Sequence, residues 1–228
     1  MRHVFVETNW LVDYAAPAHH RISQAEVLLN SAARGRIRLY LPSICISEAR
    51  RPLLENYQPR STADRVRAFL RWAKREGVVS NSDADATRRV LDTMESRIKT
   101  DLARLDDVFR SLGNTAGLEI LNLSQQMLEQ CTDLSYLKLG LGPFDQAILA
   151  SVLVKAREIA DAGEGPSAFC ELDSNLQPWG KEGPKDKLKQ LYDEAQLWVY
   201  GDFLLENPRM PDNWPNIAEA NRPEVPPL

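Results

Sequence analysis

HVFVETNW, residues 3–10, begins the chain with a β-branched and aromatic run and then changes to an acid, a hydroxyl and an amide. The run Val4-Phe5-Val6 favours a strand, because branched and aromatic side chains pack well on a pleated sheet. TNWLVDYAA, residues 8–16, favours a helix. This step from strand to helix predicts the first unit of an α/β protein, with Glu7 at the junction.

The same alternation of strand and helix continues along most of the chain. Gly35 is expected to close the second helix in a left-handed conformation, and Pro52 is expected to kink or break the third. The pattern predicts an α/β fold, a three-layer αβα sandwich around a mostly parallel central sheet. Strands are expected at 3–7, 36–42, 118–124, 167–173 and from 197, and helices at 8–16, 21–34, 43–57, 124–136, 144–161 and 186–195.

A long charged segment interrupts this alternation. Residues 57–116 are expected to form an inserted helical arm, with helices at roughly 61–76 and 84–112 on either side of the turn-like GVVSNSD. The main domain is therefore expected to span residues 1–206. Residues 207–228 contain six of the 14 prolines and are expected to form an extended tail.

The charge of the chain is unevenly distributed. The net charge is -4, which argues against a general nucleic-acid coat. Residues 50–110 contain 14 Lys and Arg and 10 Asp and Glu, whereas the remainder contains 14 and 22. A basic segment beside an acidic body could attract a polyanion towards a cation-loaded acidic site. Solvated helix faces are the alternative explanation for most of these arginines.

Several protein classes have no support in the sequence. No apolar run reaches the roughly 18–20 residues that span a bilayer, and the first residues lack the features of a secretion signal. Cys45, Cys131 and Cys170 are few and widely spaced, which fits buried thiols in a reducing compartment. No dinucleotide-binding or P-loop glycine pattern occurs. We therefore expect a cytoplasmic protein that does not associate with a membrane.

Four acidic residues from distant parts of the chain are candidates for a single site. Glu7 and Asp173 close two expected strands, and ligands of open α/β sheets bind beyond the carboxyl ends of the strands. Asp145 and Glu48 lie at helical spacing from apolar residues, so both should face the core. Carboxylates gathered in this way repel one another unless a cation lies between them. Mg²⁺ or Mn²⁺ held by such a cluster supports phosphodiester chemistry.

Each of these acids also has a simpler explanation when it is taken alone. Glu7 could be an exposed charge at the end of a strand, and Asp145 could be a first-turn aspartate that the helix dipole favours. Asp173 could be a turn residue, and Glu48 could pair with a nearby arginine. The order of the four acids at strand and helix junctions favours the shared site.

Neighbouring polar residues could orient the acids. Thr8 and Asn9 directly follow Glu7, and Asn175 lies two residues after Asp173. No Ser-His-Asp or Cys-His spacing supports nucleophilic catalysis.

Two further acids are spare, which means that this interpretation does not assign them to the site. Asp13 belongs to the first expected helix. Glu171 precedes Asp173 by two residues, so the alternation of side chains along a strand places both on the same side.

The four segments resemble, in this order, the motifs of a PIN domain. VFVETNW resembles the family's first strand running into Asp-Thr-Asn, and LPSICISE resembles its second acid on the helix after the next strand. DQAILA, residues 145–150, is similar to the third motif. FCELDSN is similar to the fourth, with Glu171 where threonine is common. The resemblance covers about residues 1–56 and 117–206.

The resemblance implies a PIN-like sandwich that acts as a metal-dependent endoribonuclease. Glu7, Glu48, Asp145 and Asp173 would be the catalytic residues and would hold Mg²⁺ or Mn²⁺. Glu7 stands where the family usually has aspartate, and its extra methylene moves the carboxylate by about 1.5 Å. A catalytically weak module that binds RNA or protein without cutting is the alternative that this substitution leaves open.

RNA is the partner that we expect, with its phosphates gripped by arginines near the site and on the arm. Two other partners stay open. The chain could be the toxin of a toxin–antitoxin pair, with an antitoxin bound to it, or the arm could be a homodimer interface. The candidate arginines are Arg50, Arg51, Arg67 and Arg71.

Overall fold

A five-stranded, all-parallel sheet forms the centre of the protein, with the strand order β3-β2-β1-β4-β7. The computed structural model describes residues 2–58, 60–180 and 183–206. The apolar strands β1, β4 and β7 are buried almost throughout, as expected for parallel strands that helices cover on both faces. The strands are β1 (Arg2–Val6), β2 (Ile37–Pro42), β3 (Leu118–Leu121), β4 (Ser167–Cys170) and β7 (Leu197–Tyr200).

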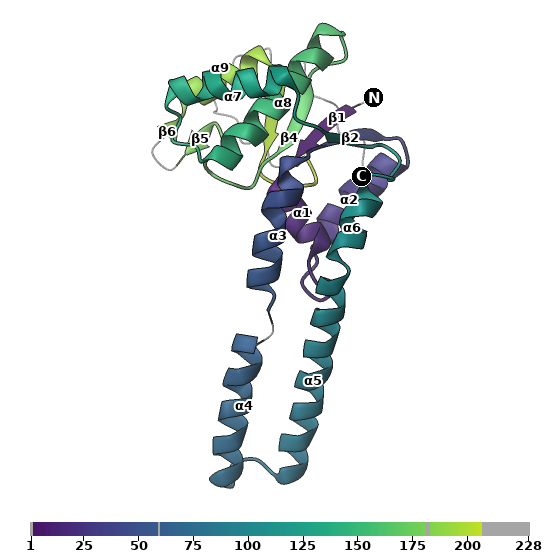
Figure 1. Ribbon diagram of the computed structural model, residues 1–228, viewed down its shortest axis with the longest axis vertical. Coiled ribbons are helices and arrows are strands. Elements are labelled where there is room, and N and C mark those ends of the chain that lie inside the picture. Colours follow the sequence, from purple (N-terminus) through teal and green to yellow (C-terminus); the bar gives the residue numbers. More distant parts are fainter. Residues whose placement is uncertain (1, 59, 181–182, 207–228) are drawn as a thin grey trace.

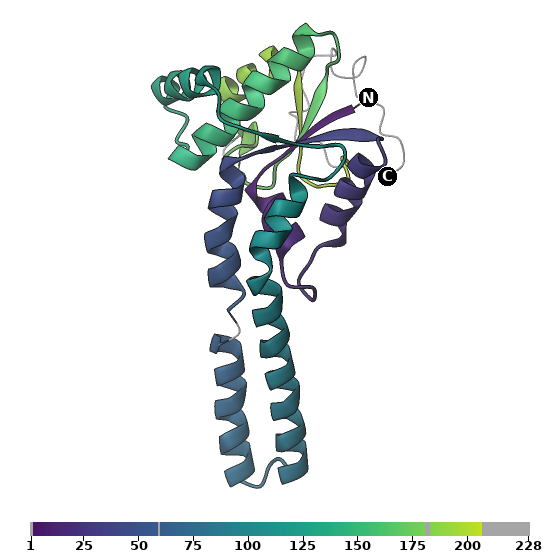
Figure 2. The same cartoon turned by 45° about the vertical axis from the view of Figure 1, so that its right-hand side comes forward.

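Helices lie on both faces of this sheet, which makes the three-layer α/β fold that the sequence predicts. One face carries α1 (Thr8–Ala15) and α2 (Ser23–Ala33), and the other carries α7 (Gln125–Leu137), α8 (Pro143–Asp161) and α9 (Asp186–Glu194), as Figures 1 and 2 show. α8 is the most deeply buried of them, with nine buried residues. A short second sheet, β5 (Trp179–Gly180) with β6 (Gly183–Pro184), was not predicted.

The third helix differs from its prediction. α3 (Ile44–Asn56) continues through Pro52 instead of breaking there. Proline removes one backbone hydrogen bond within a helix, and here the packing of Cys45, Ala49 and Leu53 in the core outweighs that loss. Gly35 does adopt the expected left-handed conformation, with φ of 71° after α2.

The inserted segment has two parts. α4 (Arg60–Arg75) and α5 (Asn81–Ala103) form a hairpin that projects away from the sheet (Figures 1 and 2), whereas α6 (Leu105–Leu112) packs its apolar residues into the main core. The single helix predicted at 84–112 is thus interrupted at Arg104.

A small apolar cluster of its own holds the hairpin together. Ala63, Leu70 and Leu91 are buried between the two helices, away from the main core. Along one side, Arg67 forms ion pairs with Asp92 at 2.8 Å and Glu95 at 2.6 Å.

Two further findings complete the description. Residues 207–228, predicted as a proline-rich tail, lie outside the described residues. Within the described ranges, no helix combines the length and the apolar character that crossing a membrane requires.

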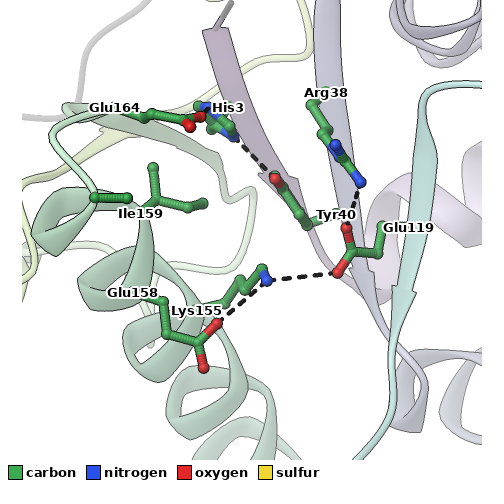
Figure 3. Close-up of a pocket in the computed structure, with 9 residues that line it drawn as sticks. His3, Arg38, Tyr40, Glu119, Lys155, Glu158, Ile159 and Glu164 are labelled. Atoms are coloured by element: carbon green, nitrogen blue, oxygen red, sulfur yellow. Dashed lines mark hydrogen bonds and ion pairs between the residues drawn. The ribbon is translucent and has the colours of Figure 1, made fainter.

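A hollow of about 310 Å³ lies between α8 and the starts of β1 and β2 (Figure 3). His3 is buried there between two partners, Tyr40 Oη and Glu164 Oε2, each 2.9 Å from a ring nitrogen. Other charged residues that line this hollow form ion pairs: Arg38 and Lys155 both contact Glu119. Because each acid drawn in Figure 3 contacts a lysine, arginine or histidine side chain, this hollow is a paired structural network.

We predict that His3→Gln reduces the loss of stability of the protein in weak acid. Burial lowers the pKa of His3 below its ordinary value of 6.5, partly opposed by the contact with Glu164. Below pH 6.5 His3 therefore binds a proton more readily in the unfolded chain than in the folded protein, and the free energy of unfolding falls as the pH decreases. The glutamine variant lacks this term, so chemical denaturation at pH 7 and pH 5.5 should show a smaller decrease than in the wild type. The exposed His20→Gln should retain the wild-type decrease; an equal decrease in His3→Gln would contradict the prediction.

Candidate active site

The candidate site lies where the order of the strands reverses. The chain runs from β1 outward to β2 and β3, and then returns to place β4 on the other side of β1. In sheets of this kind the crevice beyond the carboxyl ends of the two central strands is the usual binding position. Glu7 directly follows β1, and Glu171 directly follows β4.

All four predicted acids line one hollow of about 670 Å³ at this position. Glu7 comes from the end of β1, Glu48 from α3, Asp145 from the start of α8, and Asp173 from the loop after β4. The fold thus brings together residues separated by up to 166 positions in the chain. The other lining residues are Thr8, Asn9, Val12, Ser47, Arg51, Pro52, Asn56, Phe144, Ile148 and Leu176.

Glu7 is the most deeply buried of the four, with 4% of its surface exposed. Its Oε2 accepts a hydrogen bond of 2.6 Å from the backbone N–H of Asn9, so Glu7 also caps the N-terminus of α1. Its Oε1 is buried and has no partner. Burial raises the pKa of Glu7, the nearby carboxylates of Glu48 and Asp173 add to the shift, and the bond from Asn9 opposes it, so that the resulting pKa is about 8.

Glu48 and Asp145 are half-buried and each is held by one neighbour. Thr8 Oγ1 donates a hydrogen bond to Glu48 Oε2, so Thr8 orients Glu48 and not Glu7. The backbone N–H of Gly142 donates to Asp145 Oδ2 at 3.3 Å, at the start of α8. Burial is the main cause that raises the pKa of both carboxyls.

The loop after β4 presents Asp173. Asn175 donates to both of its oxygens, from its backbone N–H at 2.9 Å and from its side chain at 3.4 Å. Lys185 Nζ donates to the carbonyls of Ser174 and Asn175 at 2.5 and 2.9 Å, which ties this loop to the start of α9. Lys185 could not be predicted from the sequence, because a lysine bound to carbonyl oxygens has no characteristic spacing.

Glu171, spare in the sequence interpretation, is fully buried beside Glu7. Its Oε1 accepts from the backbone N–H of Asp173 at 2.5 Å, whereas its Oε2 has no partner. Burial raises the pKa of Glu171 well above its ordinary value, and the charge of Glu7 adds to the shift. Asp13, the other spare acid, does not line the hollow.

Basic side chains lie near this acidic group without an ion pair: Arg51 lines the same hollow, and Asp173 attracts the ammonium group of Lys185. In the part of the chain that the structure describes, none of the five carboxylates has an ion pair with Lys, Arg or His. Within the same residues, no three His, Cys, Asp or Glu side chains already stand in an arrangement that could hold a metal ion. The acids line a wide hollow, so their side chains would have to move towards one another to bind a cation together.

The four candidate arginines have different surroundings. Arg51 lines the hollow, with 82% of its side chain exposed and Nε at 2.9 Å from Glu55. Arg50 is paired with Asp106. Arg71 is exposed on α4, whereas Arg67 is held within the hairpin by Asp92 and Glu95.

Comparisons of the chain with models of known protein families, with curated proteins and with solved structures found no match.

We predict that Glu7→Gln stabilises the metal-free protein at alkaline pH. The folded carboxyl, with its pKa of about 8, retains a proton that the unfolded chain releases near pH 4.5. The free energy of unfolding therefore falls as pH rises from 4.5 through 8, by up to about 1.4 kcal/mol per pH unit. In EDTA, urea denaturation should show a larger gain for Glu7→Gln at pH 8.5 than at pH 6. The exposed Glu55→Gln on α3 is the control, and a gain independent of pH would contradict the prediction.

Proposed function

We propose that this protein is a PIN-like, metal-dependent endoribonuclease of the cytoplasm. The buried Oε1 of Glu7, which has no partner, is the observation that carries the proposal. Leaving a buried carboxylate oxygen unpaired is costly, and three other carboxylates around the same hollow raise the cost. A divalent cation would satisfy all four.

The donor atoms suit a hard cation. Carboxylate oxygens are the ligands that Mg²⁺ and Mn²⁺ prefer, and the hollow offers Glu7, Glu48, Asp145 and Asp173 without a thiol or an imidazole among its lining residues. When bound, such an ion would make a water molecule more acidic and would stabilise charge on the reacting phosphate.

The residues of the chain would supply position. Thr8 and Asn175 each hold one carboxylate in place, and the N-terminus of α1 directs its backbone N–H groups at Glu7. These contacts orient each carboxylate before a cation binds, and the carboxylates would then close around the ion.

The hollow also suggests a path for a nucleic-acid strand. Its lining runs along α3 from Ser47 to Asn56, a rise of about 13 Å over nine residues, and this end of α3 leads towards the hairpin of α4 and α5 (Figure 1). Arg51 lies on this path and Arg71 beyond it. RNA is favoured over DNA by the resemblance of the four motifs to the PIN family.

We predict that the purified protein cleaves a mixed RNA pool in the presence of Mn²⁺. Asp145→Asn and Asp173→Asn should each lower the cleavage rate by about 100-fold or more, because each removes a charge that holds the cation. The matched control is Asp161→Asn, an exposed aspartate at the opposite end of α8. Gel analysis of end-labelled RNA measures the rates. Unchanged cleavage in the two site variants would mean that a contaminant cuts the RNA.

We also predict that the arginines differ in their contribution to RNA binding. In the Asp145→Asn background, Arg51→Gln and Arg71→Gln should each reduce the slope of log affinity against log salt by about 0.7, the value for one phosphate contact on a single strand. Fluorescence anisotropy with a labelled oligonucleotide measures the slope. Arg67→Gln is the control, since Asp92 and Glu95 already occupy its guanidinium. An equal reduction in all three variants would contradict the assignment.

A further inference from the structure

Glu7 and Glu171 stand side by side at the ends of the two central strands. Val6 of β1 pairs with Cys170 of β4, so the next residue of each strand is a glutamate. Neighbouring parallel strands are about 4.8 Å apart, which brings the two side chains to the same point of the crevice. The backbone N–H of Glu171 still donates to the carbonyl of Tyr200 at 2.8 Å, so the strand-like path of β4 extends to this residue.

Glu7 and Glu171 have equivalent hydrogen bonds. Each accepts one backbone hydrogen bond from the residue two positions later, Asn9 for Glu7 and Asp173 for Glu171. Each has one remaining oxygen that is buried and has no partner. Two adjacent carboxyl groups that each bury an oxygen without a protein partner are costly, and a cation between them would reduce that cost.

The surroundings offer no other compensation. The nearest titratable groups besides the acids are the thiols of Cys45 and Cys170 and the hydroxyl of Tyr192, whose pKa values burial raises, so all three remain neutral. Tyr192 donates its hydroxyl to the carbonyl of Leu176 at 2.6 Å and is not available to Glu171. No Lys, Arg or His in the described ranges contacts either glutamate.

We propose that Glu171 is a direct ligand of the divalent cation, so that the site has a fifth carboxylate and binds Mg²⁺ or Mn²⁺ between Glu7 and Glu171. This inference rests on the proposed function and adds to it a fully buried ligand next to Glu7, one that is not among the lining residues of the hollow. Glu171 takes a place where threonine is common in the family that the motifs resemble. A threonine hydroxyl there could give a hydrogen bond, whereas the carboxylate supplies a charge for the cation.

The test compares Mn²⁺ binding by the full chain with binding by Glu171→Gln. Glutamine keeps the shape of the side chain and can still accept the bond from the Asp173 N–H, but it carries no charge. We expect its dissociation constant for Mn²⁺, measured by calorimetry and by electron paramagnetic resonance, to rise about tenfold or more. Asp13→Asn, a half-buried acid on α1 away from the hollow, should bind Mn²⁺ as the wild type does.

Thermal melting distinguishes a metal ligand from a residue that only stabilises the fold. In EDTA, Glu171→Gln should melt at the same temperature as the wild type or above it, because an unpaired buried acid has been removed. Added Mn²⁺ should raise its melting temperature less than that of the wild type. A variant that is more stable in EDTA but binds Mn²⁺ like the wild type would show that the two glutamates share a proton, and would overturn the proposal.

A crystal of the wild-type protein soaked in Mn²⁺ provides the second measurement, which does not depend on a variant folding. Anomalous density between Glu7 and Glu171 is expected, and density confined to Glu48, Asp145 and Asp173 would overturn the proposal. Wild-type protein that cleaves RNA while Glu171→Gln binds Mn²⁺ unchanged would reject this inference alone. Wild-type protein that neither binds Mn²⁺ nor cleaves RNA would reject the proposed function as well.

Discussion

Electrostatic repulsion between buried carboxylates is the constraint around which the rest of the structure is arranged. Glu7 and Glu171 lie at the ends of β1 and β4, and Asp145, Glu48 and Asp173 surround the same crevice. A fold that serves only its own stability would place basic side chains among these acids or expose them to water. Here the basic residues pair elsewhere, and the acids are held by backbone N–H groups, a threonine and an asparagine.

The two ends of α8 illustrate the contrast. At its N-terminal end Asp145 faces the acidic hollow with no cation beside it. Near its C-terminal end Lys155 lies between Glu119 and Glu158, and His3 lies between Tyr40 and a glutamate (Figure 3). The same helix therefore borders one hollow whose acids each contact a lysine, arginine or histidine side chain and one whose acids form no ion pair in the described residues. Acids without such partners are expected at a site that binds a cation from solution.

Much of the fold was accessible from the sequence, because its signals are local. The alternation of buried strands and amphipathic helices gave the layer architecture, and acids at strand ends gave the position of the site. The continuity of α3 through Pro52 was not accessible, since it depends on how well Cys45 and Leu53 pack in the core. The division of the insertion at Arg104 was missed for the same reason: only the finished core decides that α6 belongs to it.

In the candidate site, too, local features could be predicted from the sequence, whereas contacts between distant residues could not. Glu171 and Asp13 were both spare acids in the sequence, where alternation placed Glu171 on the same side as Asp173. Strand register, which pairs Val6 with Cys170, separates them by bringing Glu171 beside Glu7. Likewise, Arg67 and Arg71 both belong to a basic helix, and only the position of α5 shows that Arg67 is engaged within the hairpin.

The hairpin of α4 and α5 has an energetic consequence of its own. A small cluster of Ala63, Leu70 and Leu91, with Val66 and Met94 packed against it, holds two helices that extend far beyond the main core. Such a small core gives few contacts to lose, so the hairpin can open as an independent unit while the sheet stays folded. Its amide hydrogens should exchange with deuterated water through this partial opening, long before those of β1 and β4. A ligand could therefore change the position of the hairpin at a small cost in free energy, while the sheet keeps its structure.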